Sequence, residues 1–303
     1  MSKRTVSQRL AEQSISASDE PSAYPKRPRL EGTSNLSPDP QSLRVLQYPD
    51  TSKHSNKQTP FQQPTQLISF SYNSSHTLEF NDSALRYYVD PPPEAKLNYG
   101  YESWIRKPDG RARIDGLLEA FAKARETSNV PLHDVGVVAW RGVMTRILTS
   151  PYEEREELEL NVMSVNGTLY FEEHLSEERL KEKNNMEPRH RIQTYYGYAF
   201  ESYCTSETPN LKVSTKPSEP VGWSGNVDTN IQWCSVVRTK LGNTRLLIGG
   251  EVDCVREFAT ERYTYQTDTF VELKTSLAIR GSRDEAKFEK YISSAYWKAP
   301  KLD

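Results

Sequence analysis

Two short charged motifs in the last quarter of the chain constrain its fold most. They read GEVDC and VELKT, and each has the alternation of a β-strand. Residues at i and i+2 of a strand point to the same face, which pairs Glu251 with Asp253 and Glu272 with Lys274. If the two strands are neighbours, three carboxylates and one ammonium converge. Gathered carboxylates repel one another unless a cation joins them, and oxygen-only ligands suit a divalent cation.

The setting of these charges favours a site over a solvated strand face. A lone strand acid usually faces solvent, but Glu251 follows the apolar run Leu246–Ile248, and Glu272 follows Phe270 and Val271. Buried charges are costly unless they are paired or bound to metal. Carboxylates with an adjacent lysine suit metal-assisted hydrolysis of phosphodiesters and pyrophosphates. An acid followed by ExK is also the order of residues in PD-(D/E)xK nucleases.

Composition limits the classes of protein that remain. The chain has 303 residues, a net charge of -2 and 35% hydrophobic residues, which suits one large domain or two small ones. No apolar run approaches the roughly 20 residues that span a bilayer, so no membrane association is expected. The three cysteines are odd in number and form no CxxC pair, which disfavours a disulfide framework or a zinc site and favours a reducing compartment.

The first 64 residues differ in composition from the rest. They are rich in Ser, Pro, Gln and charged residues, with too few apolar residues for a core, so we predict a disordered tail over 1–64. The basic cluster Pro25–Arg29 lies inside it. Nuclear import and a merely solvated charge run explain this cluster about equally well. One folded domain is expected over 65–303.

Periodicity in that domain predicts strands interspersed with helices, and therefore an α+β (mixed α/β) fold. Asn166-Gly167 is the favoured pair for a type I′ hairpin turn. Asp109 and Ser176 are candidate helix caps. The predicted helices cover 112–125, 176–183, 188–203 and 283–297. The predicted strands cover 67–72, 85–89, 135–141, 158–165, 168–171, 231–240, 244–254 and 269–276.

For three further residues, the local sequence alone leaves the role open. Glu201 ends the motif GYAFE and either bridges metal ions or is a surface acid. Arg141, after an apolar strand, either pairs with a carboxylate or binds phosphate oxygens, which its planar guanidinium suits. Cys234 lies in a strand-like run with no nearby histidine, and a core cysteine is the default interpretation.

The motifs in their order resemble one family. WRG, GYAFE, GEVDC and VELKTS, together with ALRYY and NIQWCSV, make residues 67–280 similar to the DXO family of RNA decapping enzymes and 5′→3′ exoribonucleases. The segment Gly100–Trp104 and the helix after it resemble the fungal branch, whose members are nuclear partners and activators of a large 5′→3′ exoribonuclease.

The resemblance implies a fold with two mixed β-sheets, flanking helices and an active-site pocket between the sheets. It implies that Glu251, Asp253, Glu272 and Lys274 are catalytic. Binding of the RNA 5′ end is implied for Arg141, Cys234, Lys274 and Glu251. Two Mg²⁺ or Mn²⁺ ions would be held by Glu201, Glu251, Asp253, Glu272 and the carbonyl of Leu273.

The implied function is metal-dependent hydrolysis of RNA 5′ ends in the nucleus. The substrates implied are NAD caps, unmethylated caps and 5′ pyrophosphate, and some family members also degrade the RNA body. A non-catalytic protein that binds and stabilises an exoribonuclease is the alternative, and a PD-(D/E)xK DNA endonuclease is a weaker one. Relatives continue beyond the ExK strand with a segment absent here, so 65–303 is expected to be C-terminally incomplete. His76 and Ala112 stand where relatives often have charged pocket residues.

Overall fold

The computed structural model describes residues 58–111, 113–127, 134–150, 157–209, 216–256 and 266–275. The chain divides into two units, Met1–Asn56 and Lys57–Asp303, and all described residues belong to the second. Most of the predicted tail, its basic cluster, Ala112 and the predicted helix over 283–297 lie outside these ranges. None of the helices described is long and apolar enough to cross a membrane.

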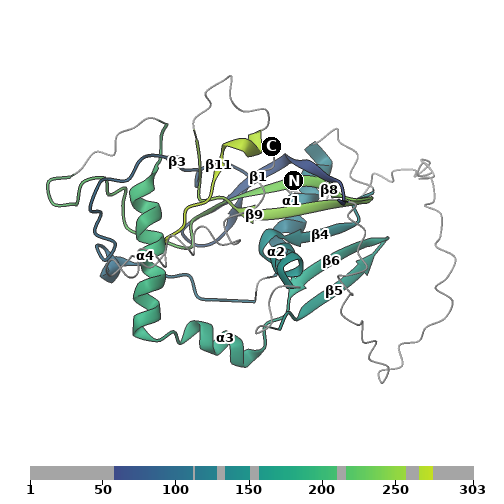
Figure 1. Ribbon diagram of the computed structural model, residues 1–303, viewed down its shortest axis with the longest axis horizontal. Coiled ribbons are helices and arrows are strands. Elements are labelled where there is room, and N and C mark those ends of the chain that lie inside the picture. Colours follow the sequence, from purple (N-terminus) through teal and green to yellow (C-terminus); the bar gives the residue numbers. More distant parts are fainter. Residues whose placement is uncertain are drawn as a thin grey trace, which may run out of the picture. The chain divides into compact units, whose positions relative to one another are not determined.

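Two mixed β-sheets form the second unit, which confirms the predicted fold class (Figure 1). The larger has the order β2-β1-β8-β9-β4-β6-β5, with β4 parallel to both of its neighbours. Its strands are β1 Phe61–Tyr72, β2 Leu78–Glu79, β4 Val137–Trp140, β5 Leu160–Val165, β6 Thr168–Glu173, β8 Gln232–Leu241 and β9 Thr244–Glu251. The smaller has the order β11-β10-β3-β7, made of β3 Tyr87–Tyr88, β7 Thr205–Ser206, β10 Cys254–Val255 and β11 Phe270–Val271.

The helices described are α1 Asp115–Thr127, α2 Arg141–Thr149, α3 Glu177–Asn184 and α4 Pro188–Cys204, with short 3-10 turns at Tyr101–Ser103 and Gln266–Thr269. Two of them, α1 and α2, cover the faces of the larger sheet. Val138 of β4 packs in the cluster that contains Leu117 of α1, whereas Ala139 packs with Val143 of α2. Adjacent strand residues point to opposite faces. The sheet therefore lies between α1 and α2.

Local sequence signals are confirmed at the hairpin and at one cap. Asn166 and Gly167 have φ of 50° and 79°, as a type I′ turn requires, and Val165 pairs with Thr168 across it. The Ser176 side chain accepts a hydrogen bond from the backbone N–H of Arg179 and caps α3.

Other predicted boundaries were wrong. β1 begins at Phe61, inside the predicted tail, because its polar first half is held by backbone pairing to β8 and not by alternating apolar residues. Of the strand predicted over 85–89, only Tyr87–Tyr88 pairs. Asp109 does not cap α1: its carboxylate pairs with Arg106 instead. The predicted strand 135–141 ends at Trp140, where α2 begins, a helix that we did not predict.

The largest difference concerns the two charged motifs. The strand predicted over 244–254 is divided: β9 ends at Glu251 in the larger sheet, and β10 starts at Cys254 in the smaller one. Between them the Val252 N–H donates to the Trp233 carbonyl. β11 likewise ends at Val271, before Glu272 and Lys274. The charges that were expected on strand faces therefore lie at strand ends, where backbone crosses between the sheets.

Candidate active site

The ends of β9, β10 and β11 bring three predicted carboxylates together. Asp253 directly precedes β10, and antiparallel pairing of Cys254 with Val271 places Glu272 beside it. The backbone N–H of Leu273 donates to Asp253 Oδ2 at 2.6 Å. The expectation that the two motifs are neighbours is thus confirmed, whereas the expected sharing of one strand face is wrong. The site is a junction of two sheets.

Helix α4 adds the fourth carboxylate. It turns Tyr195, Ala199 and Tyr203 into an aromatic core, while Tyr198 and Glu201 line the cavity described below. Burial, and then the charges of Asp253 and Glu251, raise the pKa of Glu201 to about 8. Within the described residues the Glu201 carboxylate accepts no hydrogen bond that would offset these charges.

The central acids also perturb one another. Burial and the charge of Asp253 raise the pKa of Glu251 to about 7, although Gln232 Nε2 donates to Glu251 Oε2 at 2.7 Å. The pKa of Asp253 is raised mainly by burial, against the opposing effect of the Leu273 N–H. The charge of Asp253 thus adds to the effect of burial at Glu251, and the charge of Glu272 adds to it at Asp253.

Glu272 is the exception, because two cations hold it. Arg141 Nη1 donates to Glu272 Oε2 at 2.7 Å, and Lys274 pairs with the other carboxylate oxygen. Burial alone would raise the pKa of Glu272, but these two hydrogen bonds outweigh it and lower the pKa. Of the two readings left open for Arg141, pairing with a carboxylate is what this structure shows.

Gly250 lies under the Arg141 side chain, which extends to Glu272. Arg141 starts α2 on the face of the sheet opposite to α1, and its side chain passes over β9. A Cβ added at Gly250 would lie 3.1 Å from Arg141 Cβ and 3.3 Å from its Nε. A larger residue before Glu251 would therefore have to displace the Arg141 side chain by a few tenths of an ångström.

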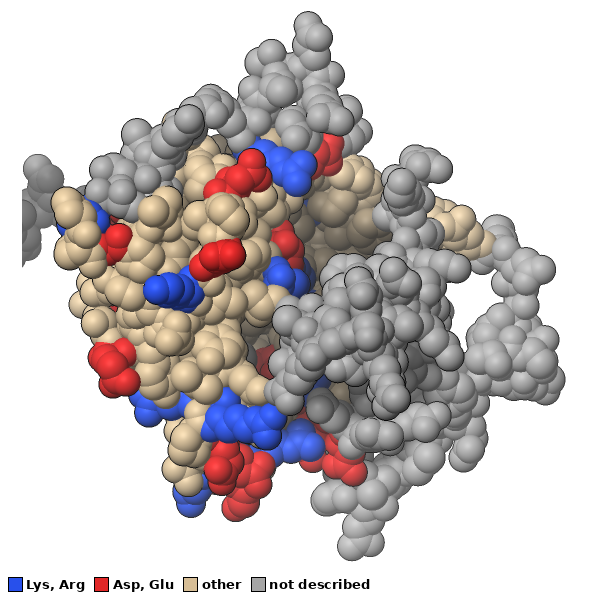
Figure 2. Space-filling model, turned by 60° about the vertical axis from the view of Figure 1, so that its left-hand side comes forward, with Lys and Arg blue, Asp and Glu red and all other residues tan. Residues whose placement is uncertain are grey.

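A cavity of about 1320 Å³ opens in front of part of this site. Glu201, Glu251, Asp253 and Cys234 line it, whereas Arg141, Glu272 and Lys274 do not. Cys234 pairs with Glu251 across β8 and β9 and is 4% exposed, and burial raises the pKa of its thiol to about 12. Cys234 is therefore a neutral wall residue. On the face that Figure 2 shows, acidic and basic side chains are interspersed, without one dominant sign.

Two further polar residues of the cavity wall, Lys107 and Gln232, were not among the candidate residues predicted from the sequence. Lys107 Nζ donates to Gln232 Oε1 at 3.1 Å, and Gln232 in turn contacts Glu251. No local signal marks Lys107, because its partner lies 125 residues away in the sequence. Gln232 belongs to the motif NIQWCSV, which was the available sequence signal.

The donor set fits a divalent cation by its chemistry, since hard cations prefer carboxylate and carbonyl oxygens. Burial, and then the charges of neighbouring acids, raise the pKa values of Glu201 and Glu251, and a cation bound beside them would offset both effects. No three Asp, Glu, His or Cys side chains in the described ranges are grouped closely enough to hold a metal ion. Glu272 is held by its two cations, and Asp253 by the Leu273 N–H.

A PD-(D/E)xK-like fold is defined by these two mixed sheets and the acidic residues at their junction. A family model described as "RAI1 like PD-(D/E)XK nuclease" matches residues 62–299. The chain belongs to this family.

Its relatives include fungal and animal proteins. "Decapping nuclease RAI1" of Mycosarcoma maydis is 37% identical over 77% of this chain, and "Decapping and exoribonuclease protein" of Bos taurus is 33% identical over 78%. The chain spans 55% and 59% of the lengths of these two proteins.

Solved structures of similar fold are known with ligands. Candida albicans Rai1 in complex with pU5-Mn²⁺ has a TM-score of 0.65 and 27% identity, over 78% of this chain and 65% of that one. Scheffersomyces stipitis Rai1 in complex with (3′-NADP)⁺ and calcium ion has a TM-score of 0.64 and 25% identity, over 76% and 67%.

Proposed function

We propose that this chain is a divalent-cation-dependent hydrolase of RNA 5′ ends, removing NAD caps, unmethylated caps or 5′ pyrophosphate. The observation that carries the proposal is the junction of the two sheets, where Glu201, Glu251 and Asp253 meet on one cavity wall beside Glu272. Family membership and the nucleotide and cation ligands of the two fungal Rai1 structures support it.

The residues of the site have separate roles in the proposed reaction. Glu201, Glu251, Asp253, Glu272 and the Leu273 carbonyl would hold one or two ions of Mg²⁺ or Mn²⁺. A bound ion supplies Lewis acidity toward the phosphoryl group. Lys274 lies beside Glu272 and offsets negative charge that develops on the phosphate. Arg141 orients Glu272 and presents its remaining guanidinium donors to the RNA 5′ end, while Cys234 shapes the wall.

A panel of RNAs of one sequence tests the substrate class. The 5′ ends are NAD, triphosphate, unmethylated cap and hydroxyl, with a circular RNA and a matched DNA as controls. We expect hydrolysis of at least one of the first three, with slow or no cutting of the circle and the DNA. Cutting of the DNA or the circle at comparable rates would show an endonuclease and refute the proposal.

We also propose that the chain binds and activates a nuclear 5′→3′ exoribonuclease. The resemblance of Gly100–Trp104 to the fungal branch supports a partner. The edge strand β5 also supports a binding partner, because its Val162, Met163 and Val165 are 50–53% exposed. Nuclear location is supported by the basic cluster Pro25–Arg29. Sedimentation with the purified exoribonuclease of the same organism should show a complex; separate sedimentation at micromolar concentration would refute this part.

A further inference from the structure

Lys107 is a cation of the cavity wall that is bonded only to neutral groups. Its Nζ lies 3.1 Å from His76 Nε2 and 3.1 Å from Gln232 Oε1. No carboxylate forms an ion pair with Lys107 in the part of the chain that the structure describes. An ammonium carries three donors and no acceptor, so one donor stays available toward the cavity.

His76 is fixed as a neutral acceptor for this lysine. Because Lys107 can only donate, His76 Nε2 accepts, and its Nδ1 donates to the Asn230 carbonyl at 3.0 Å. The imidazole stacks on Tyr72, with ring centroids 4.1 Å apart and an interplanar angle of 21°. Burial, and then the charge of Lys107, lower the pKa of His76 against the opposing effect of the hydrogen bond to Asn230.

The backbone around Lys107 is anchored as well. The Lys107 N–H donates to Thr229 Oγ1 at 2.8 Å, and Ile105 forms a parallel bridge with Asp228. The side chain is therefore held by His76 and Gln232, and the backbone by the loop before β8. An ammonium held in this way is positioned before any ligand arrives, which lowers the entropic cost of binding.

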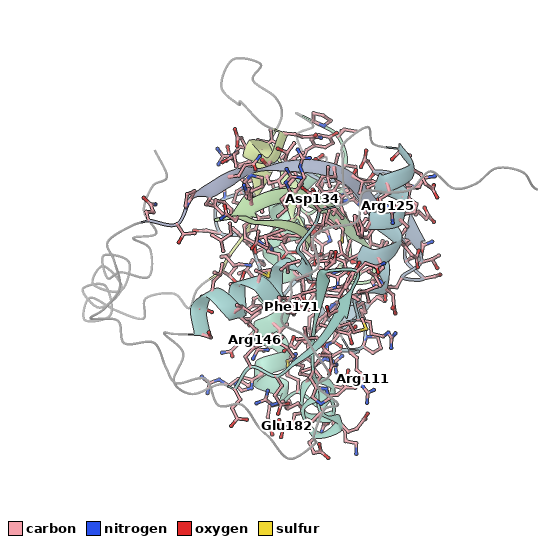
Figure 3. The ribbon with its side chains drawn as sticks, turned by 90° about the vertical axis from the view of Figure 1, so that its right-hand side faces the viewer. Arg111, Arg125, Asp134, Arg146, Phe171 and Glu182 are labelled. Carbon is pink, nitrogen blue, oxygen red and sulfur yellow. The ribbon has the colours of Figure 1, made fainter. Side chains whose placement is uncertain are left out.

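The arginines that line the same cavity are different, because each is paired with an acid. Arg86 pairs with Glu207, Arg113 with Asp115, and Arg111 with Glu177 of α3. Figure 3 shows Arg111 near α3, on which Glu182 is labelled. Their charges are compensated, whereas the charge of Lys107 is not compensated by direct contact.

We propose that Lys107, supported by His76 and Gln232, is an anion subsite that binds a phosphate group at the 5′ end of the ligand. The inference rests on the proposed function and refines it, because it assigns discrimination between phosphorylated and hydroxyl 5′ ends to one side chain. Burial lowers the pKa of Lys107, so its ammonium is poorly solvated, and an anion in contact with it would offset that cost. A partly desolvated charge also attracts phosphate more strongly than one in water.

A different role for Lys107 must be separated from this one. Its charge also acts on Glu251, both directly and through Gln232, so the alternative is that Lys107 serves only the carboxylate site. A lysine with that role alone would affect all RNAs equally. A phosphate subsite would affect only RNAs that carry a 5′ phosphate.

The test is binding of 5′-triphosphate and 5′-hydroxyl oligouridine of equal length, measured with Ca²⁺ in place of Mg²⁺ or Mn²⁺. For Lys107→Met we expect about tenfold weaker binding of the triphosphate, the effect of losing one charge-assisted hydrogen bond. Binding of the hydroxyl RNA should not change. The salt dependence of triphosphate binding should fall by about one charge. Lys107→Arg should keep most of the preference, and the matched control Arg111→Gln should keep all of it.

Equal weakening for both RNAs, or an unchanged preference in Lys107→Met, would refute the subsite. A circular dichroism melt of Lys107→Met excludes unfolding as the cause, and Lys107→Arg tests the charge itself if Lys107→Met melts early. The two proposals fail separately. A parent that prefers triphosphate RNA through Lys107 and hydrolyses no 5′ end would refute only the proposed function.

Discussion

Asp253→Asn is expected to lower the rate of 5′-end hydrolysis by on the order of 10²–10³ and to leave the melting temperature unchanged or raised. A cation that polarises a phosphoryl group contributes several kcal/mol, and each 1.4 kcal/mol or so is about tenfold in rate. The amide oxygen can still accept from the Leu273 N–H, while the repulsion of Glu201 and Glu251 is relieved. Single-turnover hydrolysis and a melt in EDTA measure both effects.

Asp253→Ala is the informative companion. It removes the same charge but leaves the buried N–H of Leu273 without its acceptor, which costs about 1–3 kcal/mol. Both variants should lose activity, and only the alanine variant should melt earlier. A large fall in melting temperature for Asp253→Asn would make the carboxylate structural and contradict its assignment to the metal site.

The metal-free protein is expected to lose stability as the pH rises, with Glu201 as a main cause. Its folded pKa of about 8 lies above its ordinary value of 4.5, so between these two values the folded state keeps a proton that the unfolded state has lost. The stabilising effect of that proton is complete below the ordinary value and disappears as the pH passes about 8. After solvent screening, a loss of even about 1 kcal/mol in the free energy of unfolding lowers the melting temperature by about 2–4 °C.

Glu201→Gln isolates this effect. In EDTA the variant should melt higher than the parent at about pH 8, and the difference should shrink toward about pH 5. Mn²⁺ should raise the melting temperature of the parent at the higher pH and raise that of the variant less. A constant difference between variant and parent at all pH values would contradict the raised pKa of Glu201.

The gathering of the carboxylates could be predicted from sequence, but its geometry could not. The residue types and spacing of Glu251, Asp253 and Glu272 form a motif that can be recognised in the sequence. They meet because the two motifs follow apolar strands. That the chain leaves one sheet between Glu251 and Cys254 follows from the Val252 N–H bonding to Trp233, a contact between distant segments. Strand alternation contains no information about such a crossing.

The positively charged side chains of the site were harder to predict from the sequence than the carboxylates. The role of Arg141 depends on its packing over Gly250 and on its pairing with Glu272, which lies 131 residues away in the sequence. Lys107 has no motif at all. Helix α2, in contrast, had a local signal that we missed, because Val143 and Met144 recur at the spacing of one buried helix face with Ile147.

The most direct measurement is release of 5′-terminal label from triphosphate- and NAD-RNA by the parent and by Glu251→Gln, first in EDTA and then with Mn²⁺ added. The account predicts no release in EDTA, rapid release by the parent once Mn²⁺ is added, and little or none by the variant. A folded parent that releases no label with Mn²⁺, or one that releases it equally in EDTA, would contradict a metal-dependent 5′-end hydrolase at the junction of the two sheets.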